Sequence, residues 1–149
     1  MSNNSMQSRR VVQTVELGAP AAQVWDLVGG FFTLHQWHPD IVKTEVPANQ
    51  TEVHAIRRIL TFPGQPTTTE ELLTMDNIGF QYRYKWHAGE WGERIKDYFA
   101  EIRVFETEMG RHCVMQWSST FTYTEDALSE FYWNGFRALQ SRFPLTDKV

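Results

Sequence analysis

The strongest constraint on the fold is a series of strand-like segments that fills the middle of the sequence. Each break between the segments contains Gly, Pro or Asn, the residues that tight connections between antiparallel strands need. The segments alternate in polarity or are rich in β-branched and aromatic residues, which favours strands. The sequence therefore predicts an antiparallel sheet with strands at residues 41–46, 52–62, 67–75, 80–86, 95–105 and 112–123.

The N-terminal part adds one strand and two short helices. Residues 1–8 are expected to form a disordered lead, and the alternating, Val-rich residues 11–17 predict a first strand. Pro20 suits the first turn of a helix, and the glycines at 29–30 end that helix. A second short helical piece is expected over residues 31–37.

The C-terminal part predicts one long helix. Residues 124–126 are suited to cap it, and Pro144 stops it after about Phe143. Its apolar residues recur every three or four positions, so one stripe is expected to be buried. That stripe consists of Leu128, Phe131, Tyr132, Gly135, Phe136 and Leu139.

Together these elements predict a single α+β domain over residues 9–149. One long helix is too small to fill the inside of a curved seven-stranded sheet. The remaining space is expected to be a cavity.

Charge and cysteine usage exclude several classes of function. The net charge is −4, and no run of Lys and Arg is longer than the pairs at 9–10 and 57–58, so a nucleic-acid partner is not expected. No charge-free stretch approaches the ~20 apolar residues that membrane insertion needs. The single cysteine, Cys113, excludes an internal disulfide and predicts a buried core residue in a cytoplasmic protein.

Aromatic residues are abundant, with 6 Trp, 5 Tyr and 10 Phe in 149 residues. Rings in such numbers can fill a core with their own side chains. They can also line a pocket for an apolar ligand. Both interpretations stay open at this point.

Several local patterns, taken in order over residues 11–143, resemble the START-like (SRPBCC) superfamily, in its polyketide cyclase/dehydrase and lipid transport branch. The resemblance implies a helix-grip fold, in which a curved seven-stranded antiparallel sheet, two short helices and one long C-terminal helix enclose a cavity. The patterns are AQVWDLVG at 22–29, WHP at 37–39, EELLTMD at 70–76, IKDY at 95–98 and VMQW at 114–117.

The plant abscisic-acid receptors of this superfamily are similar over the central strands. The resemblance implies that Glu70 and Tyr98 face the cavity, together with Tyr82 and Lys43. Residues 62–66 stand where these receptors have their gate loop, but the sequence there differs. Abscisic acid is therefore not implied as the ligand.

Strand alternation gives an independent prediction for the same residues. Glu70 shares a face with Leu72, so an inward Glu70 would pair with Arg58 or Lys43, or sit in a wet cavity with a shifted pKa. The alternative is that Glu71 faces inward and Glu70 is solvated. The candidate ligand-binding residues are Glu70, Tyr82, Tyr84, Tyr98, Met115, Trp117, Phe131 and Lys43.

Catalytic and metal-binding roles are less well supported by the sequence. A cyclase or dehydratase needs a general acid–base pair, for which Glu70 and Tyr98 are candidates, but no spacing fixes such a pair. His35 and His38 could share a helix face, yet no third ligand lies at a diagnostic spacing, so no metal site and no cofactor are expected. We expect His38 to make a capping contact.

The sequence thus leads to one main hypothesis and two alternatives. The main hypothesis is binding or carriage of a small hydrophobic molecule, lipid- or polyketide-like, in an internal cavity. The first alternative is a polyketide cyclase/aromatase or dehydratase that uses the same cavity. The second is a non-catalytic interaction module whose cavity is filled by its own side chains. A homodimer is possible in each case.

Overall fold

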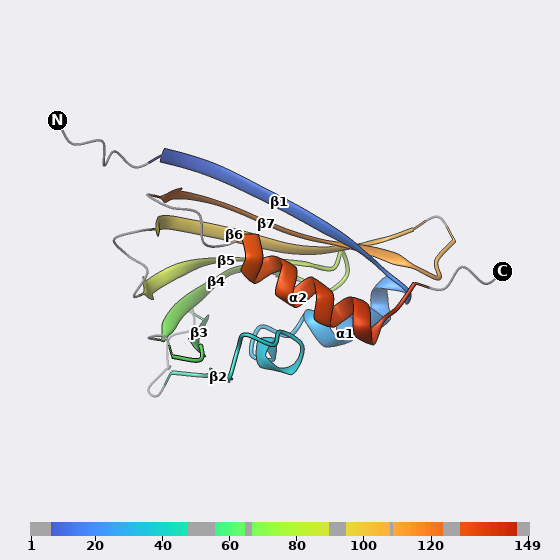
Figure 1. Ribbon diagram of the computed structural model, residues 1–149, viewed down its shortest axis with the longest axis horizontal. Helices are drawn as coiled ribbons and strands as arrows, with labels where there is room; N and C mark the ends of the chain where they lie inside the picture. The colour runs from blue at the N-terminus through green and yellow to red at the C-terminus, as the bar shows by residue number, and fades with distance from the viewer. Residues whose placement is uncertain are drawn as a thin grey trace.

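The computed structural model describes residues 7–47, 56–64, 67–89, 95–107, 109–123 and 129–145. Seven strands form one antiparallel sheet in the order β1-β7-β6-β5-β4-β3-β2, which curves but does not close (Figure 1). The strands are β1 (Gln7–Leu17), β2 (Lys43–Glu45), β3 (Ile56–Thr61), β4 (Thr68–Asp76), β5 (Gln81–Gly89), β6 (Ile95–Glu106) and β7 (Cys113–Tyr123).

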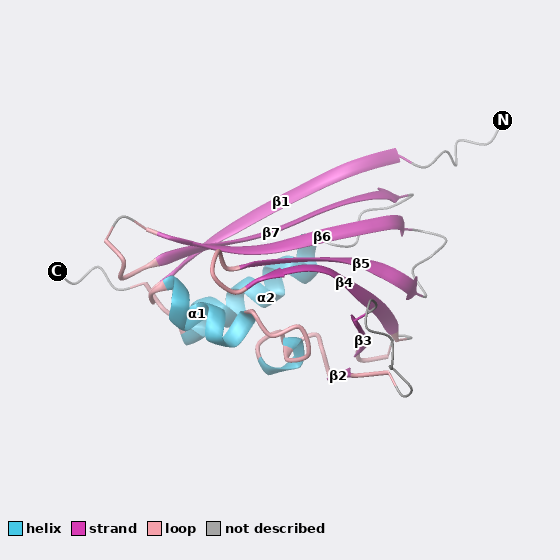
Figure 2. Ribbon diagram, turned by 180° about the vertical axis from the view of Figure 1, so that it is seen from behind, coloured by secondary structure: helices cyan, strands magenta, loops and turns pink. Residues whose placement is uncertain are grey.

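The helices lie on the concave side of this sheet. They are α1 (Ala21–Val28), the 3-10 turn η1 (Leu34–Gln36) and α2 (Ser129–Arg142). Figure 2 shows from behind that α1 and α2 cover the same face. The predicted helix-grip architecture is therefore confirmed.

The boundaries of several elements differ from the prediction. β1 begins at Gln7, because its pairing with β7 continues without interruption to Tyr123. The second helical piece is only the three-residue η1, and β2 is likewise short. The predicted cap at 124–126 and the predicted strand start at residue 52 lie outside the described residues.

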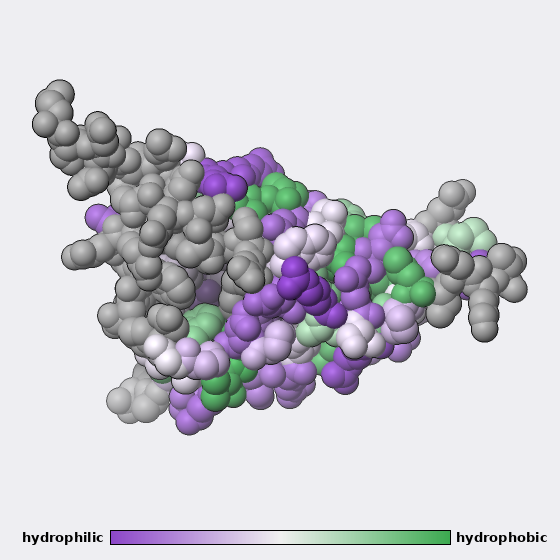
Figure 3. All heavy atoms as spheres, in the orientation of Figure 1, coloured by the Kyte–Doolittle hydropathy of each residue, from purple (hydrophilic) through white to green (hydrophobic). Residues whose placement is uncertain are grey.

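Inward-facing side chains of the strands and the apolar stripe of α2 form the core. In β4 the pairing with β5 shifts between Leu72 and Thr74, so Leu72 and Met75 both pack against the core. Gly135 lets α2 approach closely, since a Cβ there would lie 2.6 Å from Cδ2 of His38. With its apolar stripe turned to the sheet, α2 presents a largely hydrophilic outer side (Figure 3).

Candidate functional site

A buried ion pair stands on the concave face of the sheet. Arg58 of β3 and Glu70 of β4 lie directly opposite each other in the strand register, and both are buried. Nε and Nη2 of Arg58 donate to Oε1 of Glu70 at 2.9 and 2.7 Å. Nη1 of Arg58 donates to the Phe31 carbonyl at 2.8 Å and to the Tyr82 hydroxyl at 3.3 Å. Trp86 Nε1 donates to the second oxygen of Glu70 at 3.2 Å.

Aromatic rings enclose the guanidinium group. Cζ of Arg58 lies 4.2 Å from the ring centroid of Phe31 and 4.9 Å from that of Tyr84. Contacts at these distances are favourable cation–π interactions, and they strengthen when water is excluded. The ion pair is therefore held by hydrogen bonds in the plane of the guanidinium and by rings against it.

Burial shifts the pKa values of both charged groups. Burial raises the pKa of Glu70 above its usual range, and the opposing effects of Arg58 and Trp86 do not cancel this. Burial by itself would lower the pKa of Arg58, but Tyr82 and Glu70 keep it above its ordinary value. The arginine therefore stays charged, whereas the carboxyl holds a proton more readily than a solvated one.

A second group of polar side chains lies between β6, β7 and α2. The Tyr132 hydroxyl donates to Ser119 Oγ at 2.7 Å and shares a hydrogen bond with the Tyr98 hydroxyl. Burial raises the pKa of Tyr98 and of Tyr132, so both stay neutral phenols at physiological pH. The ring of Trp86 stacks on that of Tyr98 at 4.6 Å, which joins this group to the ion pair.

An open groove of about 580 Å³ lies beside the ion pair, between α1 with the loop after it and strands β3 and β4 with the β4–β5 turn. Its size is in the range of small-molecule sites, roughly 300–1,000 Å³. Trp25 is held in the groove wall by its Nε1, which donates to Asn77 Oδ1 at 2.9 Å. The lining is mostly apolar: Ala22, Trp25, Asp26, Gly29, Gly30, Phe31, Phe32, Ile56, Leu72, Met75, Asn77 and Phe80.

Phe31 connects the groove with the ion pair. It lines the groove, its ring lies against Arg58 and Tyr82, and its carbonyl accepts a hydrogen bond from Arg58. The guanidinium is therefore one ring away from the groove. Neither Phe31 nor the groove was identified from the sequence, because both depend on how the loop after α1 folds back on the sheet.

Glu70 occupies the place predicted for it, but with other neighbours. It faces inward, as its parity with Leu72 predicts, and it pairs with Arg58, one of the two expected cations. The Tyr98 hydroxyl bonds to Tyr132 and makes no direct hydrogen bond to Glu70. Trp86, which lies opposite Glu70 in the β4–β5 register, takes the position instead.

Lys43 does not reach the buried cluster. Its side chain is 61% exposed, and its ammonium pairs with Glu45 at 3.4 Å. β2 is a three-residue strand at the edge of the sheet, so Lys43 has no inward course toward Glu70. The side chain of Phe131 lies outside what the structure describes.

The space under α2 is occupied near Trp117. Tyr82, Tyr84, Met115 and Trp117 are fully buried on the inner face. The Trp117 ring stacks on Tyr132 at 4.6 Å and also contacts Trp37, His38 and Phe136. In this region the protein's own rings fill the space in which a cavity was expected.

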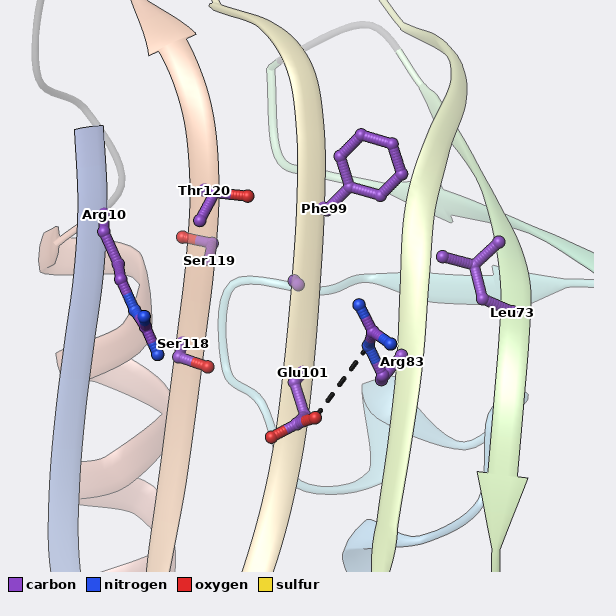
Figure 4. A pocket seen from close by; sticks show the side chains of 9 residues that line it. Arg10, Leu73, Arg83, Phe99, Glu101, Ser118, Ser119 and Thr120 are labelled. Carbon is purple, nitrogen blue, oxygen red and sulfur yellow. Dashed lines mark ion pairs between the residues drawn. The ribbon is translucent and has the colours of Figure 1, made fainter. Parts of the chain in front are cut away.

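Figure 4 shows a different depression, on the outer face of the sheet. It is shallow and mixed in character, with Arg83 and Glu101 paired at 3.9 Å and an Arg83 side chain that is largely exposed. Its residues are Arg10, Leu73, Arg83, Phe99, Ala100, Glu101, Ser118, Ser119 and Thr120. It is typical of a solvated sheet face.

The histidines of the described part of the chain do not gather into a metal cluster. His38 Nδ1 accepts a hydrogen bond from the Asp40 amide at 3.1 Å, so this bond belongs to the turn after η1 and does not cap a carbonyl of the helix. The described residues contain no cluster of three or more His, Cys, Asp or Glu suited to a metal ion. No helix in the described part of the chain has the length and apolar character to cross a membrane.

Comparison with known proteins finds one matching family, described as polyketide cyclase/dehydrase and lipid transport, over residues 8–142. No curated protein matches the sequence significantly. A Bacillus thuringiensis protein of known structure is 25% identical with a TM-score of 0.79, covering 91% of this chain and 98% of its own. Protein XoxI from Bacillus cereus is 26% identical with a TM-score of 0.77, covering 90% and 94%. The Zhui aromatase/cyclase from Streptomyces sp. R1128 shares the fold at 15% identity, with a TM-score of 0.73 and coverages of 91% and 93%.

Proposed function

Because the chain belongs to the polyketide cyclase/dehydrase and lipid transport family, we propose that it binds a small hydrophobic molecule, lipid- or polyketide-like, in the groove beside α1. One observation carries the proposal: an apolar groove of ligand size is lined by Phe31, whose ring lies against the buried Arg58 of the arginine–glutamate pair. Sites for small molecules typically combine apolar walls with a few placed polar groups. A cytoplasmic location and the lack of a nucleic-acid partner stay predictions.

The groove and the ion pair would have different roles in binding. The apolar part of the ligand packs against Trp25, Phe32 and Met75, where removal of apolar surface from water drives association. A carbonyl or hydroxyl at its inner end accepts a hydrogen bond from Arg58 once the Phe31 ring turns aside. A ligand with one polar end and an apolar body fits this arrangement best.

A substitution that fills the groove tests this proposal. Met75→Trp adds bulk inside the groove, whereas Leu73→Trp places the same ring on the outer face of the same strand. We expect Met75→Trp to weaken binding of cis-parinaric acid, a fluorescent fatty acid, and of the dye anilinonaphthalene sulfonate by about tenfold or more. Leu73→Trp should bind both probes like the wild type.

The result also separates the proposal from the filled interaction module. If neither probe binds, or if both variants bind them equally well, the groove is not a ligand site. In that case the second alternative is favoured, an interaction module whose cavity is filled by its own side chains. Both variants should unfold cooperatively, which far- and near-ultraviolet circular dichroism can check.

A catalytic role has one observation in its favour. Glu70 is a buried carboxyl with a raised pKa beside a permanent cation, which is the setting of a group that transfers protons to a substrate carbonyl. Incubation with linear poly-β-ketone thioesters, followed by absorbance of aromatic products, tests it. Glu70→Gln should lower turnover about 100-fold with little change in binding if the carboxyl acts as acid or base. If the wild type forms no aromatic product, the catalytic role is rejected and only the proposal of ligand binding remains.

A further inference from the structure

The first strand, β1, forms a long and regular edge of the sheet. It pairs with β7 over eleven consecutive positions without a bulge, and it stands at the end of the strand order. Figures 1 and 2 show it along the outer border of the sheet. Regular edges of this kind offer a row of backbone donors and acceptors to another strand. The opposite edge, β2, is short and carries the Lys43–Glu45 ion pair, two features that discourage such pairing.

The sequence of β1 is complementary to itself in one antiparallel register. Residues that lie directly opposite each other must face the same side, so a twofold axis has to pass through a residue. An axis through Gln13 places Arg10 opposite Glu16 at both ends. An axis through Val12 instead sets Arg10 opposite Thr14, and an axis through Thr14 sets Val12 opposite Glu16. The register centred on Gln13 is the one of these three that pairs the charges.

The two charged residues are available for this pairing. Arg10 and Glu16 are exposed on the outer face, and neither has an ion-pair partner among the described residues. Figure 4 shows Arg10 extending from β1 along the outer face near Ser118. The dimer requires this flexible side chain to rotate from that position toward the free edge. Opposite charges at facing positions of two strands stabilise the pair.

Gln13, at the proposed axis, has an unmet hydrogen-bonding group. It faces inward opposite Trp117, and its buried Oε1 has no partner among the described residues. A buried amide oxygen without a donor is costly. In the twofold arrangement two Gln13 amides face each other, so that each can turn to the edge and donate to the other. This observation is independent of the charge pattern and indicates the same centre.

The end of β1 sets the length of the pairing. The amide of Gly18 donates to the Phe143 carbonyl at 2.9 Å, and a Cβ at Gly18 would collide with the Pro144 carbonyl. The chain that leaves α2 therefore occupies the space beyond Leu17. The stretch from Arg10 to Glu16, which the register centred on Gln13 uses, lies within β1 and clear of this segment.

We propose that the chain forms a twofold homodimer in which two β1 strands pair antiparallel about Gln13 and join two seven-stranded sheets into one. The concave faces of both copies then lie on the same side of the joined sheet. The α1 grooves lie away from the junction, since β1 and β4 are separated by three strands in the sheet order. The dimer therefore leaves each groove open.

Charge reversal tests the register directly. Arg10→Glu sets Glu opposite Glu16, and Glu16→Arg sets Arg10 opposite Arg. We expect either variant alone to raise the dimer dissociation constant about tenfold or more, measured by analytical ultracentrifugation of the full chain. An equimolar mixture of the two variants should recover a dimer of wild-type affinity, because every facing pair is then of opposite charge. The double variant R10E/E16R should recover it as well.

A charge reversal away from β1 serves as the control for these variants. Arg111→Glu makes the same charge change on the exposed β6–β7 turn and should leave the dissociation constant unchanged. A wild-type chain that stays monomeric through the micromolar range overturns the proposal. A dimer that neither reversal weakens, or one that the mixture does not restore, overturns the β1 register. Circular dichroism of each variant ensures that the fold is intact.

Discussion

Two arginine–glutamate pairs stand on the same two strands, one residue apart, and face opposite sides of the sheet. Arg58 and Glu70 face the concave side, and Arg57 and Glu71 lie directly opposite each other on the convex side. The inner pair meets at 2.7 Å with side chains 0% and 6% exposed. The outer pair meets at 3.2 Å with side chains 30% and 18% exposed, and Lys85 approaches the same Glu71 at 3.8 Å.

The two pairs have the same chemistry in different surroundings. A pair that reaches solvent gains little, because water solvates and screens the separated charges almost as well. A buried pair has lost that solvation, so each partner depends on the other. The inner pair is therefore expected to contribute to a binding site at the cost of stability. The outer pair is expected to have little effect on either.

Removal of each carboxylate should give the largest difference between the pairs. Glu70→Ala leaves Arg58 charged and buried without its partner, which should destabilise the fold by about 3–5 kcal/mol. Glu71→Ala should cost about 1 kcal/mol or less. Urea denaturation of both variants measures the free energy of unfolding. Equal losses would mean that the inner pair is hydrated.

Replacement of the whole inner pair should reverse the sign of the effect. In the double variant R58M/E70L both charges are exchanged for apolar side chains of similar length, so no buried charge is left. We expect a stability between that of the wild type and about 4 kcal/mol above it. The same double variant should lose affinity for a ligand with a polar end. A double variant as unstable as Glu70→Ala would show that the shape of the pair, and not its charge, matters.

Uncharged polar contacts should show the same contrast on a smaller scale. Tyr132→Phe removes the hydroxyl that bonds to Ser119 and Tyr98 inside the core, and should cost about 1–2 kcal/mol. Thr122→Val removes an exposed hydroxyl that donates to the Lys96 carbonyl at 3.3 Å. Its expected cost is below about 0.5 kcal/mol. Thermal unfolding of the two variants under one set of conditions gives the comparison.

Strand periodicity predicted the antiparallel sheet and which side chains share a face, and the resemblance to START-like proteins predicted the helix-grip arrangement. Alternation in β4 turned Glu70 inward, and the adjacent Arg57 and Arg58 had to face opposite sides. Periodicity carries no information on which rings meet across the core. The stacking of Trp117 on Tyr132 occupies part of the space predicted as a cavity, and the groove depends on Phe31 in a loop with no periodic pattern. The prediction that Lys43 faces the cavity was wrong for a related reason, since the length of an edge strand depends on its pairing.

The pH dependence of stability should distinguish the inner pair from solvated carboxylates by its sign. We expect this effect to be the smallest of the four differences in stability predicted here. Burial raises the pKa of Glu70 in the folded state, so the folded protein binds this proton more tightly than the unfolded chain. Its contribution to stability is therefore fully present below the unfolded pKa and is lost as the pH rises through the folded pKa. The stability of the wild type relative to Glu70→Gln should fall as the pH is raised above the usual glutamate range.

Asp76 serves as the opposite control, because the amides of Gly79 and Ile78 lower its pKa, so its contribution is lost as the pH falls. Urea denaturation at several pH values measures how the free energy of unfolding depends on pH at each carboxyl. If the stability of the wild type relative to Glu70→Gln instead grows with pH, Arg58 outweighs burial at this carboxyl.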